Sequence, residues 1–249
     1  MNAPEPQARG GRRAGTLLVV VFALAEATLL IVAVLVVLPF AIIDPTLLED
    51  GPLPPGPLLA VLVVPTVLAA LVAVAGTALL GDGPRAARVR RELAARWSWR
   101  DVGRGLVIGA GGLVLTIPAS AAWATWVGDE QANSAVGEAF AGRQLGPAAA
   151  MAAFLAIWLV APVCEEVIFR GALWRALEHW RWNRWVIFIV TSLVFSVAHM
   201  ELLRTPLLLV LSVPIGLARL LTGNLLGSVV AHQVNNFLPA LGLLLALSG

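Results

Sequence analysis

Two adjacent glutamates and an arginine form the first group of residues that could do chemistry in this sequence. Glu165, Glu166 and Arg170 lie in a long apolar run, and Glu166 precedes Arg170 by four residues. On a helix these two share one face, in the order that favours an ion pair. Glu165 then lies about 100° around the helix, without a local partner. A carboxylate placed in this way can act as a general base or acid near neutral pH.

Two of the three histidines also lie inside apolar runs and form a second and a third group. His199 follows Phe195 by four residues, and His232 precedes Asn236 by four. If three helices converge, Glu165 and His199 can activate a water molecule. His232 and Asn236 can then stabilise an oxyanion. Glu165, His199 and His232 could instead bind zinc, because two histidines and a glutamate form a known catalytic zinc set.

Ionisable groups at membrane depth are costly, so they mark functional sites by default. The alternative is purely structural, with interhelical hydrogen bonds and one ion pair holding a helix bundle together. Three groups on three helices favour a site over this alternative. Glu26 stands alone in the first apolar run. For it we expect a partner on another helix, with Arg219 as one candidate; Arg219 itself is expected to face a cavity or to reach the cytoplasmic interface.

The composition places these groups in a membrane. Hydrophobic residues make up 59% of the 249 residues and charged residues 13%, against about a quarter charged in soluble domains. This excess excludes a soluble enzyme, a disordered chain and a disulfide scaffold, and it argues against a nucleic-acid partner. One cysteine, Cys164, excludes an intrachain disulfide. Because lipid permits only helices or closed barrels, we expect an all-α, polytopic membrane helix bundle.

Apolar runs of about 20 residues predict the membrane-spanning helices. We expect seven hydrophobic segments, or eight if Pro239 divides the last one. They cover 15–43, 58–80, 105–127, a run from 147 past Glu165, 185–198, 206–221 and 225–247. The predicted organisation is a cytoplasmic tail at 1–14, N-terminal transmembrane helices at 15–146 and a C-terminal catalytic core at 147–249, in one membrane domain.

The arginines predict the orientation of the bundle. All 17 basic residues are Arg, and they concentrate in 9–13, 85–104 and 181–184, whereas 44–50 and 129–146 are rich in acidic residues. By the positive-inside rule we expect a multi-pass cell-membrane protein with a cytoplasmic N-terminus. Trp97 and Trp99 lie within the most basic segment. The charge rule accounts for that segment, and anionic-lipid binding is the alternative reading.

At the three groups the sequence resembles a known family. Glu-Glu-x-x-x-Arg at 165–170, Phe-x-x-x-His at 195–199 and His-x-x-x-Asn at 232–236 match its motifs in order and spacing. It is the CPBP family of CAAX proteases and bacteriocin-processing enzymes, also called the ABI family, which includes the CAAX prenyl protease 2 (Rce1-type) endopeptidases. The resemblance covers roughly residues 150–240.

The resemblance implies an intramembrane endopeptidase that cleaves a membrane-embedded or lipid-modified peptide or protein. It implies that Glu165 is the catalytic glutamate, that His199 helps to activate water and that His232 and Asn236 stabilise the oxyanion. Glu166 and Arg170 would be supporting residues. No cofactor is preferred, because the glutamate mechanism needs no metal, and zinc remains the alternative.

Two other functions stay open at this stage. One is a non-proteolytic scaffold or immunity protein built on the same helices. The other is a small proton- or ion-coupled transporter that uses the buried ionisable groups as a relay. Other intramembrane proteases fit less well, since the sequence has no Gly-x-Ser-x-Gly, no His-Glu-x-x-His and no Asp inside an apolar run.

Overall fold

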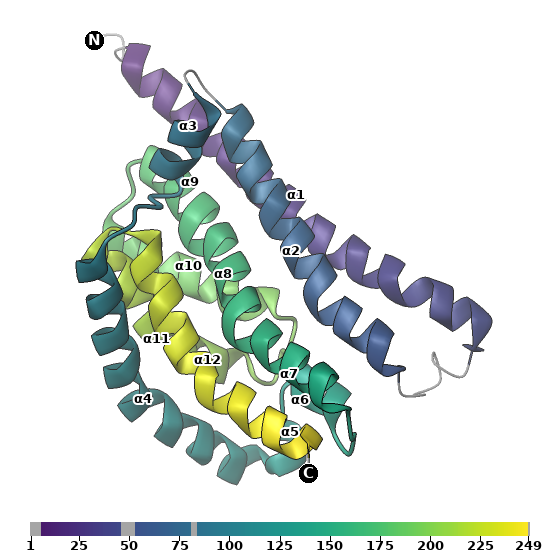
Figure 1. Ribbon diagram of the computed structural model, residues 1–249. Coiled ribbons are helices and arrows are strands. Elements are labelled where there is room, and N and C mark those ends of the chain that lie inside the picture. The colour runs from purple at the N-terminus through teal and green to yellow at the C-terminus, as the bar shows by residue number, and fades with distance from the viewer. Residues whose placement is uncertain (1–5, 46–52, 81–83, 249) are drawn as a thin grey trace.

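The computed structural model describes residues 6–45, 53–80 and 84–248, and this part of the chain is helical without any strand (Figure 1). Predicted features at 1–5 and 46–52 lie outside the described residues. The helices are α1 (Pro6–Ile43), α2 (Pro55–Leu79), α3 (Arg85–Glu92), α4 (Trp99–Val127), α5 (Asp129–Ala132), α6 (Ala135–Phe140), α7 (Pro147–Leu155), α8 (Ala161–Glu166), α9 (Trp174–His179), α10 (Arg184–Ala198), α11 (Thr205–Thr222) and α12 (Leu225–Ser248). Two π-helical segments, η2 (Ala156–Val160) and η3 (Val167–Leu173), join α7, α8 and α9.

Six helices of the described chain are long and apolar enough to cross a membrane: Gly11–Ile43, Pro55–Leu79, Trp99–Val127, Pro147–His179, Thr205–Thr222 and Leu225–Ser248. The predicted all-α, multi-pass membrane bundle is confirmed. The seventh predicted segment is the shorter apolar helix α10. Pro239 lies inside the continuous helix α12, so it does not create an eighth segment. The polar residues 6–14 continue α1 as helix.

Small residues let the helices approach closely. Figure 1 shows α1 and α2 as an antiparallel pair along one side, with α4 on the opposite side of the bundle. Gly105 of α4 faces α12, where a Cβ would lie 2.6 Å from the carbonyl oxygen of Gly227. Lipid gives no hydrophobic drive for helix association, so such close backbone contact is a main source of packing energy. α4 is thereby held against the helix that carries His232.

The segments from α7 to α9 form one continuous helical rod that runs through the bundle. Two π-helical segments, η2 and η3, interrupt its α-helix. η2 ends two residues before Pro162. Proline has no N–H to donate, and its ring clashes with the carbonyl four residues earlier, so a wider turn ahead of it relieves the conflict. η3 starts directly after Glu166 and contains Arg170. π-Helical turns occur frequently at functional sites.

α10 and α11 form a helical hairpin whose turn carries His199. At about 1.5 Å per residue, the 15 residues of α10 span roughly 22 Å, which is less than a bilayer core of about 30 Å. Arg184 at the start of α10 donates to the Leu220 carbonyl near the end of α11 at 3.0 Å. At the turn, the Glu201 carboxylate accepts a hydrogen bond from the Ala135 N–H at the start of α6. His199 therefore lies at the end of α10 whose turn is attached to α6.

Arginine-rich segments gather at the opposite end of the bundle from the C-terminus. The Trp180 indole N–H donates to the Arg12 carbonyl, which joins α1 to the end of the rod. Glu92 at the end of α3 binds Arg175 and His179 of α9, each at 2.9 Å. These contacts attach the basic segment around α3 to the rod that carries Glu165.

The attachment by Glu92 predicts a loss of stability in acid. Hydrogen bonds first from His179 and then from Arg175 and Arg91 lower the pKa of Glu92 from its ordinary 4.5 to about 2, against the opposing effect of burial. A carboxyl whose pKa is lower in the folded state stabilises the fold above its unfolded pKa. We expect the apparent unfolding temperature in detergent to fall, in part for this reason, as the pH drops from 4.5 towards 2.

Glu92→Gln tests this role of Glu92. Glu138→Gln is the matched control, because Glu138 is an exposed carboxylate on α6. At pH 6, Glu92→Gln should lower the unfolding temperature by roughly 2–4 °C, and the deficit relative to wild type should shrink in acid. Glu138→Gln should behave as wild type. A Glu92→Gln deficit that stays constant from pH 6 to 3 would contradict the assigned role of Glu92.

Candidate active site

The predicted ion pair between Glu166 and Arg170 is present and completely buried. Arg170 Nη1 lies 3.0 Å from Glu166 Oε1, and both side chains have 0% exposure. The pair crosses the junction between α8 and η3 on the central rod. Since the two charges neutralise each other, Glu166 has a structural partner within its own rod.

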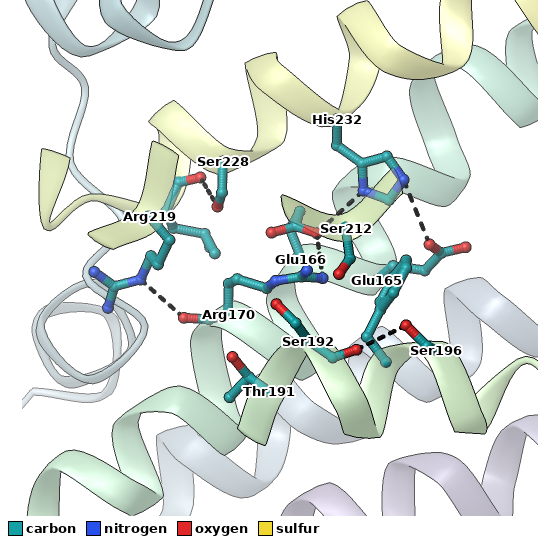
Figure 2. A network of polar contacts seen from close by, with 12 residues as sticks. Glu165, Glu166, Arg170, Thr191, Ser192, Ser196, Ser212, Arg219, Ser228 and His232 are labelled. Carbon is teal, nitrogen blue, oxygen red and sulfur yellow. Dashed lines mark hydrogen bonds and ion pairs between the residues drawn. The ribbon is translucent and has the colours of Figure 1, made fainter. Parts of the chain in front are cut away.

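His232 of α12 stands between the two glutamates (Figure 2). Its Nδ1 lies 3.1 Å from Glu166 Oε1, and its Nε2 lies 3.7 Å from Glu165 Oε2. Glu165 keeps 22% side-chain exposure, whereas Glu166 has none. The adjacent glutamates therefore have different surroundings: one is enclosed in an ion pair, and the other is partly open and faces an imidazole.

The ring of Phe195 on α10 connects three of the predicted groups. The Arg170 guanidinium carbon lies 4.5 Å from its centroid. The His199 ring lies 4.5 Å away and the His232 ring 5.8 Å away, both measured between ring centroids. Phe195 thus brings the central rod, the α10–α11 hairpin and α12 together at one point.

His199 caps the end of α10 and is oriented by its own helix. Its Nδ1 lies 2.7 Å from the Phe195 carbonyl oxygen, which is a hydrogen-bond acceptor only. The proton of a neutral His199 is therefore on Nδ1, and Nε2 keeps its lone pair. This tautomer suits a group that accepts a proton at Nε2.

Asn236 lies one helical turn beyond His232 on α12, as the spacing predicts. Its side-chain N–H donates to the Ile157 carbonyl of η2 at 3.4 Å, which is a long hydrogen bond. Among the described residues Asn236 is not hydrogen-bonded to His232, Glu165 or His199. The amide therefore contacts the rod beside the glutamates without being part of their hydrogen-bond network.

The contacts of Arg219 differ from those expected from the sequence. Its side chain is 1% exposed, so it does not reach an interface. Among the described residues it forms no ion pair with Glu26, whose buried Oε1 has no hydrogen-bond partner. Its Nε donates to the Arg170 carbonyl at 3.0 Å, and its guanidinium lies over the Trp174 ring at 5.1 Å. The expected interface position is wrong, because the guanidinium is enclosed against a carbonyl and an aromatic ring of the rod. Arg219 instead fixes the backbone that carries the central ion pair.

Glu26 is a third carboxylate near the site. It comes from α1, interacts electrostatically with Glu165, and its Oε1 is buried with no hydrogen-bond partner in the described chain. The sequence shows Glu26 as an isolated acidic residue but does not show which helix faces it. Its position follows from the packing of α1 against η3.

A layer of small polar side chains beneath Arg170 was not predicted from the sequence. Figure 2 shows Thr191, Ser192 and Ser196 of α10 and Ser212 of α11 around the arginine. Thr191, Ser196 and Ser212 are hydrogen-bonded to carbonyls of their own helices. Their spacing along α10 is the signal that could have marked them, because Ser192 and Ser196 share one helix face. They make the surroundings of the buried arginine polar.

Zinc is the alternative that the sequence leaves open for Glu165, His199 and His232. Within the described residues no group of three or more His, Cys, Asp or Glu side chains is arranged to hold a metal ion. Glu165 faces His232 Nε2, and the Nδ1 atoms of His232 and His199 lie against Glu166 and a backbone carbonyl. Histidines that bind a metal make the same contacts through their second ring nitrogen, so the zinc alternative stays a prediction.

Comparison with known protein families finds a match over the C-terminal part of the chain. Residues 147–238 match the family model of type II CAAX prenyl endopeptidases of the Rce1-like kind. This segment resembles an Rce1-like domain. It starts at the first residue of α7 and ends inside α12, so the rod, the hairpin and His232 all belong to the matched segment.

Part of the chain also resembles a curated bacterial protein. The relative is an uncharacterized 24.3 kDa protein of Escherichia coli, 33% identical over 83 residues. That match covers 32% of this chain and 38% of the relative, so the chain spans well under half of the length of that protein. No solved structure gives a significant match.

The buried ion pair predicts an asymmetric response to substitution. Arg170→Met keeps the volume of the side chain but leaves Glu166 buried without its main partner, and should cost about 3–5 kcal/mol of unfolding free energy. Arg175→Met removes a partly exposed arginine from its carboxylates and should cost about 1 kcal/mol or less. Chemical unfolding in detergent micelles measures both.

A double variant separates the ion pair from packing. Adding Glu166→Gln to Arg170→Met removes the unpaired charge and should recover part of the lost stability. If the double variant is less stable than Arg170→Met, or if Arg170→Met and Arg175→Met cost the same, the buried charge is not the origin of the effect.

Proposed function

We propose that this protein is an intramembrane endopeptidase that hydrolyses a peptide bond of a membrane-embedded or lipid-modified peptide or protein. The observation that carries the proposal is the division between the two glutamates. Glu166 is neutralised by Arg170 in a fully buried pair, whereas Glu165 is partly exposed beside His232. A partly exposed carboxylate next to an imidazole is suited to general acid–base chemistry.

In the proposed reaction Glu165 and His199 activate the water. A proton passes from the water to this pair, and the oxygen adds to the carbonyl carbon of the substrate. The Nδ1 contact of His199 with Phe195 leaves its Nε2 free to accept a proton. The same proton then goes to the leaving nitrogen, which completes hydrolysis of the C–N bond without any cofactor.

His232 and Asn236 stabilise the oxyanion in this mechanism. When His232 carries both ring protons, Nδ1 donates to Glu166 and Nε2–H remains as a donor. Asn236 has a second side-chain N–H besides the one directed at Ile157. Removing a donor of this kind typically lowers kcat by about 10²–10³-fold. Glu166 and Arg170 hold His232 in place and do not contact the substrate.

The arrangement of charge supports a cytoplasmic N-terminus. Arg12, α3 and the start of α10 lie at one end of the bundle, and arginine-rich ends remain on the cytoplasmic side of membranes. We therefore place the N-terminus of this multi-pass protein in the cytoplasm and the α10 turn towards the other side, with 147–249 as the catalytic part of one membrane domain.

The direct test is a cleavage screen with purified protein. Metal-free protein in detergent with a chelator is incubated with a library of membrane peptides, and wild type is compared with Glu165→Ala. Glu138→Gln is the matched control, because it alters an exposed carboxylate outside the site. We expect chelator-resistant cleavage by wild type and by the control, and none by Glu165→Ala, with all three equally stable.

Three outcomes would contradict the mechanism in different ways. Cleavage that a chelator abolishes and zinc restores would make Glu165, His199 and His232 metal ligands. Cleavage retained by Glu165→Ala would remove that residue from the catalytic role. A normal cellular phenotype for the Glu165→Ala and His199→Ala variants would favour a non-proteolytic scaffold or immunity protein.

A further inference from the structure

A polar pocket and an apolar groove adjoin one another at the arginine-rich end of α4. The pocket, of about 340 Å³, is lined by Arg96, Trp97, Ser98, Arg100, Asp101, Arg104 and Asn224. The groove, of about 290 Å³, is lined by Arg100, Gly103, Arg104, Val107 and Ile108. Both are outside the candidate active site, and they share Arg100 and Arg104. Together they form a continuous surface that is cationic at one end and apolar further along a membrane-spanning helix.

From this surface we infer a binding site for an anionic phospholipid, with its phosphate held by Arg96, Arg100 and Arg104 and an acyl chain lying along Val107 and Ile108. Arginine presents a fork of donors that matches phosphate oxygens. A lipid uses both halves of the surface. A soluble anion would use only the polar half.

The charges of the pocket leave cationic groups available to a ligand. Asp101 is its one acidic side chain, and it is held by the Asn224 amide at 2.9 Å and lies 3.7 Å from Arg104. Arg96 also interacts electrostatically with Asp101, but in the described part of the chain the guanidinium groups of Arg96 and Arg100 have no carboxylate within hydrogen-bond or ion-pair distance. Three arginines and one aspartate leave the pocket with a net positive charge.

The floor of the pocket is rigid. Asn224 is fully buried, and its side-chain N–H groups donate to the Arg96 carbonyl and to Asp101. Its Oδ1 accepts from the backbone N–H groups of Arg96 and Leu226. The segment before α4 is thus attached to the start of α12. These bonds fix the backbone at Arg96 and the position of Asp101, so less of the pocket must become ordered when an anion binds.

The surroundings match the headgroup level of a bilayer. Trp97 and Trp99 are 67% and 74% exposed beside the pocket, and tryptophans concentrate at the membrane–water interface. At Gly103 a Cβ would meet nothing within 4 Å, so the groove is open because this position has no side chain. The groove then follows α4 from the interface into the apolar span.

The test is native mass spectrometry of the purified full-length protein in detergent, with phosphatidylglycerol or phosphatidylcholine added at equal concentration. Wild type is compared with Arg96→Gln/Arg100→Gln and with the matched control Arg85→Gln/Arg90→Gln, which removes two exposed charges from α3 on the same side. We expect the wild-type protein to retain more phosphatidylglycerol than phosphatidylcholine. The pocket variant should bind it about tenfold more weakly, and the control less than twofold.

A third variant tests the groove without changing charge. Gly103→Leu fills open space in a helix, so it should fold normally and should reduce retention of both lipids. Equal losses in the pocket and control variants would overturn the proposal, because general surface charge would then explain binding. A second result would also overturn the proposal. If glycerol 3-phosphate displaces the lipid completely and Gly103→Leu retains lipid as well as wild type does, the surface is a site for a free anion.

Discussion

The buried pair of Glu166 and Arg170 is the interaction on which the rest of this structure depends. Two charges taken out of water lose several kcal/mol of hydration each, and only close geometry and further contacts compensate for that loss. Here the contacts come from three other helices. Phe195 of α10 covers the guanidinium, Arg219 of α11 binds the Arg170 carbonyl, and His232 of α12 binds Glu166. The need to satisfy one ion pair therefore brings together the helices that carry the site.

The pair also explains how two neighbouring glutamates acquire different roles. Successive residues on a helix point about 100° apart. Glu166 points towards Arg170, so Glu165 faces another direction and stays outside the ion pair. His232 reaches both carboxylates through its two ring nitrogens. Glu166 fixes the imidazole at Nδ1, and this contact orients Nε2 towards Glu165. His232 is thereby held in a defined position beside the partly exposed carboxylate. This link is the physical basis of the proposed hydrolytic mechanism.

Much of this arrangement could be predicted from the sequence, because it depends on local spacing. The apolar runs predict the spans, and the separation of four residues predicts the Glu166–Arg170 pair. The position of His232 between the glutamates could not be predicted, since it depends on how α12 crosses the rod. The partner of Arg219 is a backbone carbonyl, which no residue pattern reveals. The π-helical turns and the close approach of Glu26 likewise arise from packing between distant segments.

The central claim is that Glu166 holds the fold and that Glu165 is free for chemistry. The most direct measurement is the apparent unfolding temperature of Glu165→Gln and Glu166→Gln, which are isosteric changes at adjacent positions, in the same detergent. We predict that Glu165→Gln unfolds at the wild-type temperature and that Glu166→Gln unfolds several degrees lower, because it leaves Arg170 buried without its counter-ion. Equal losses in the two variants, or a larger loss in Glu165→Gln, would contradict the account.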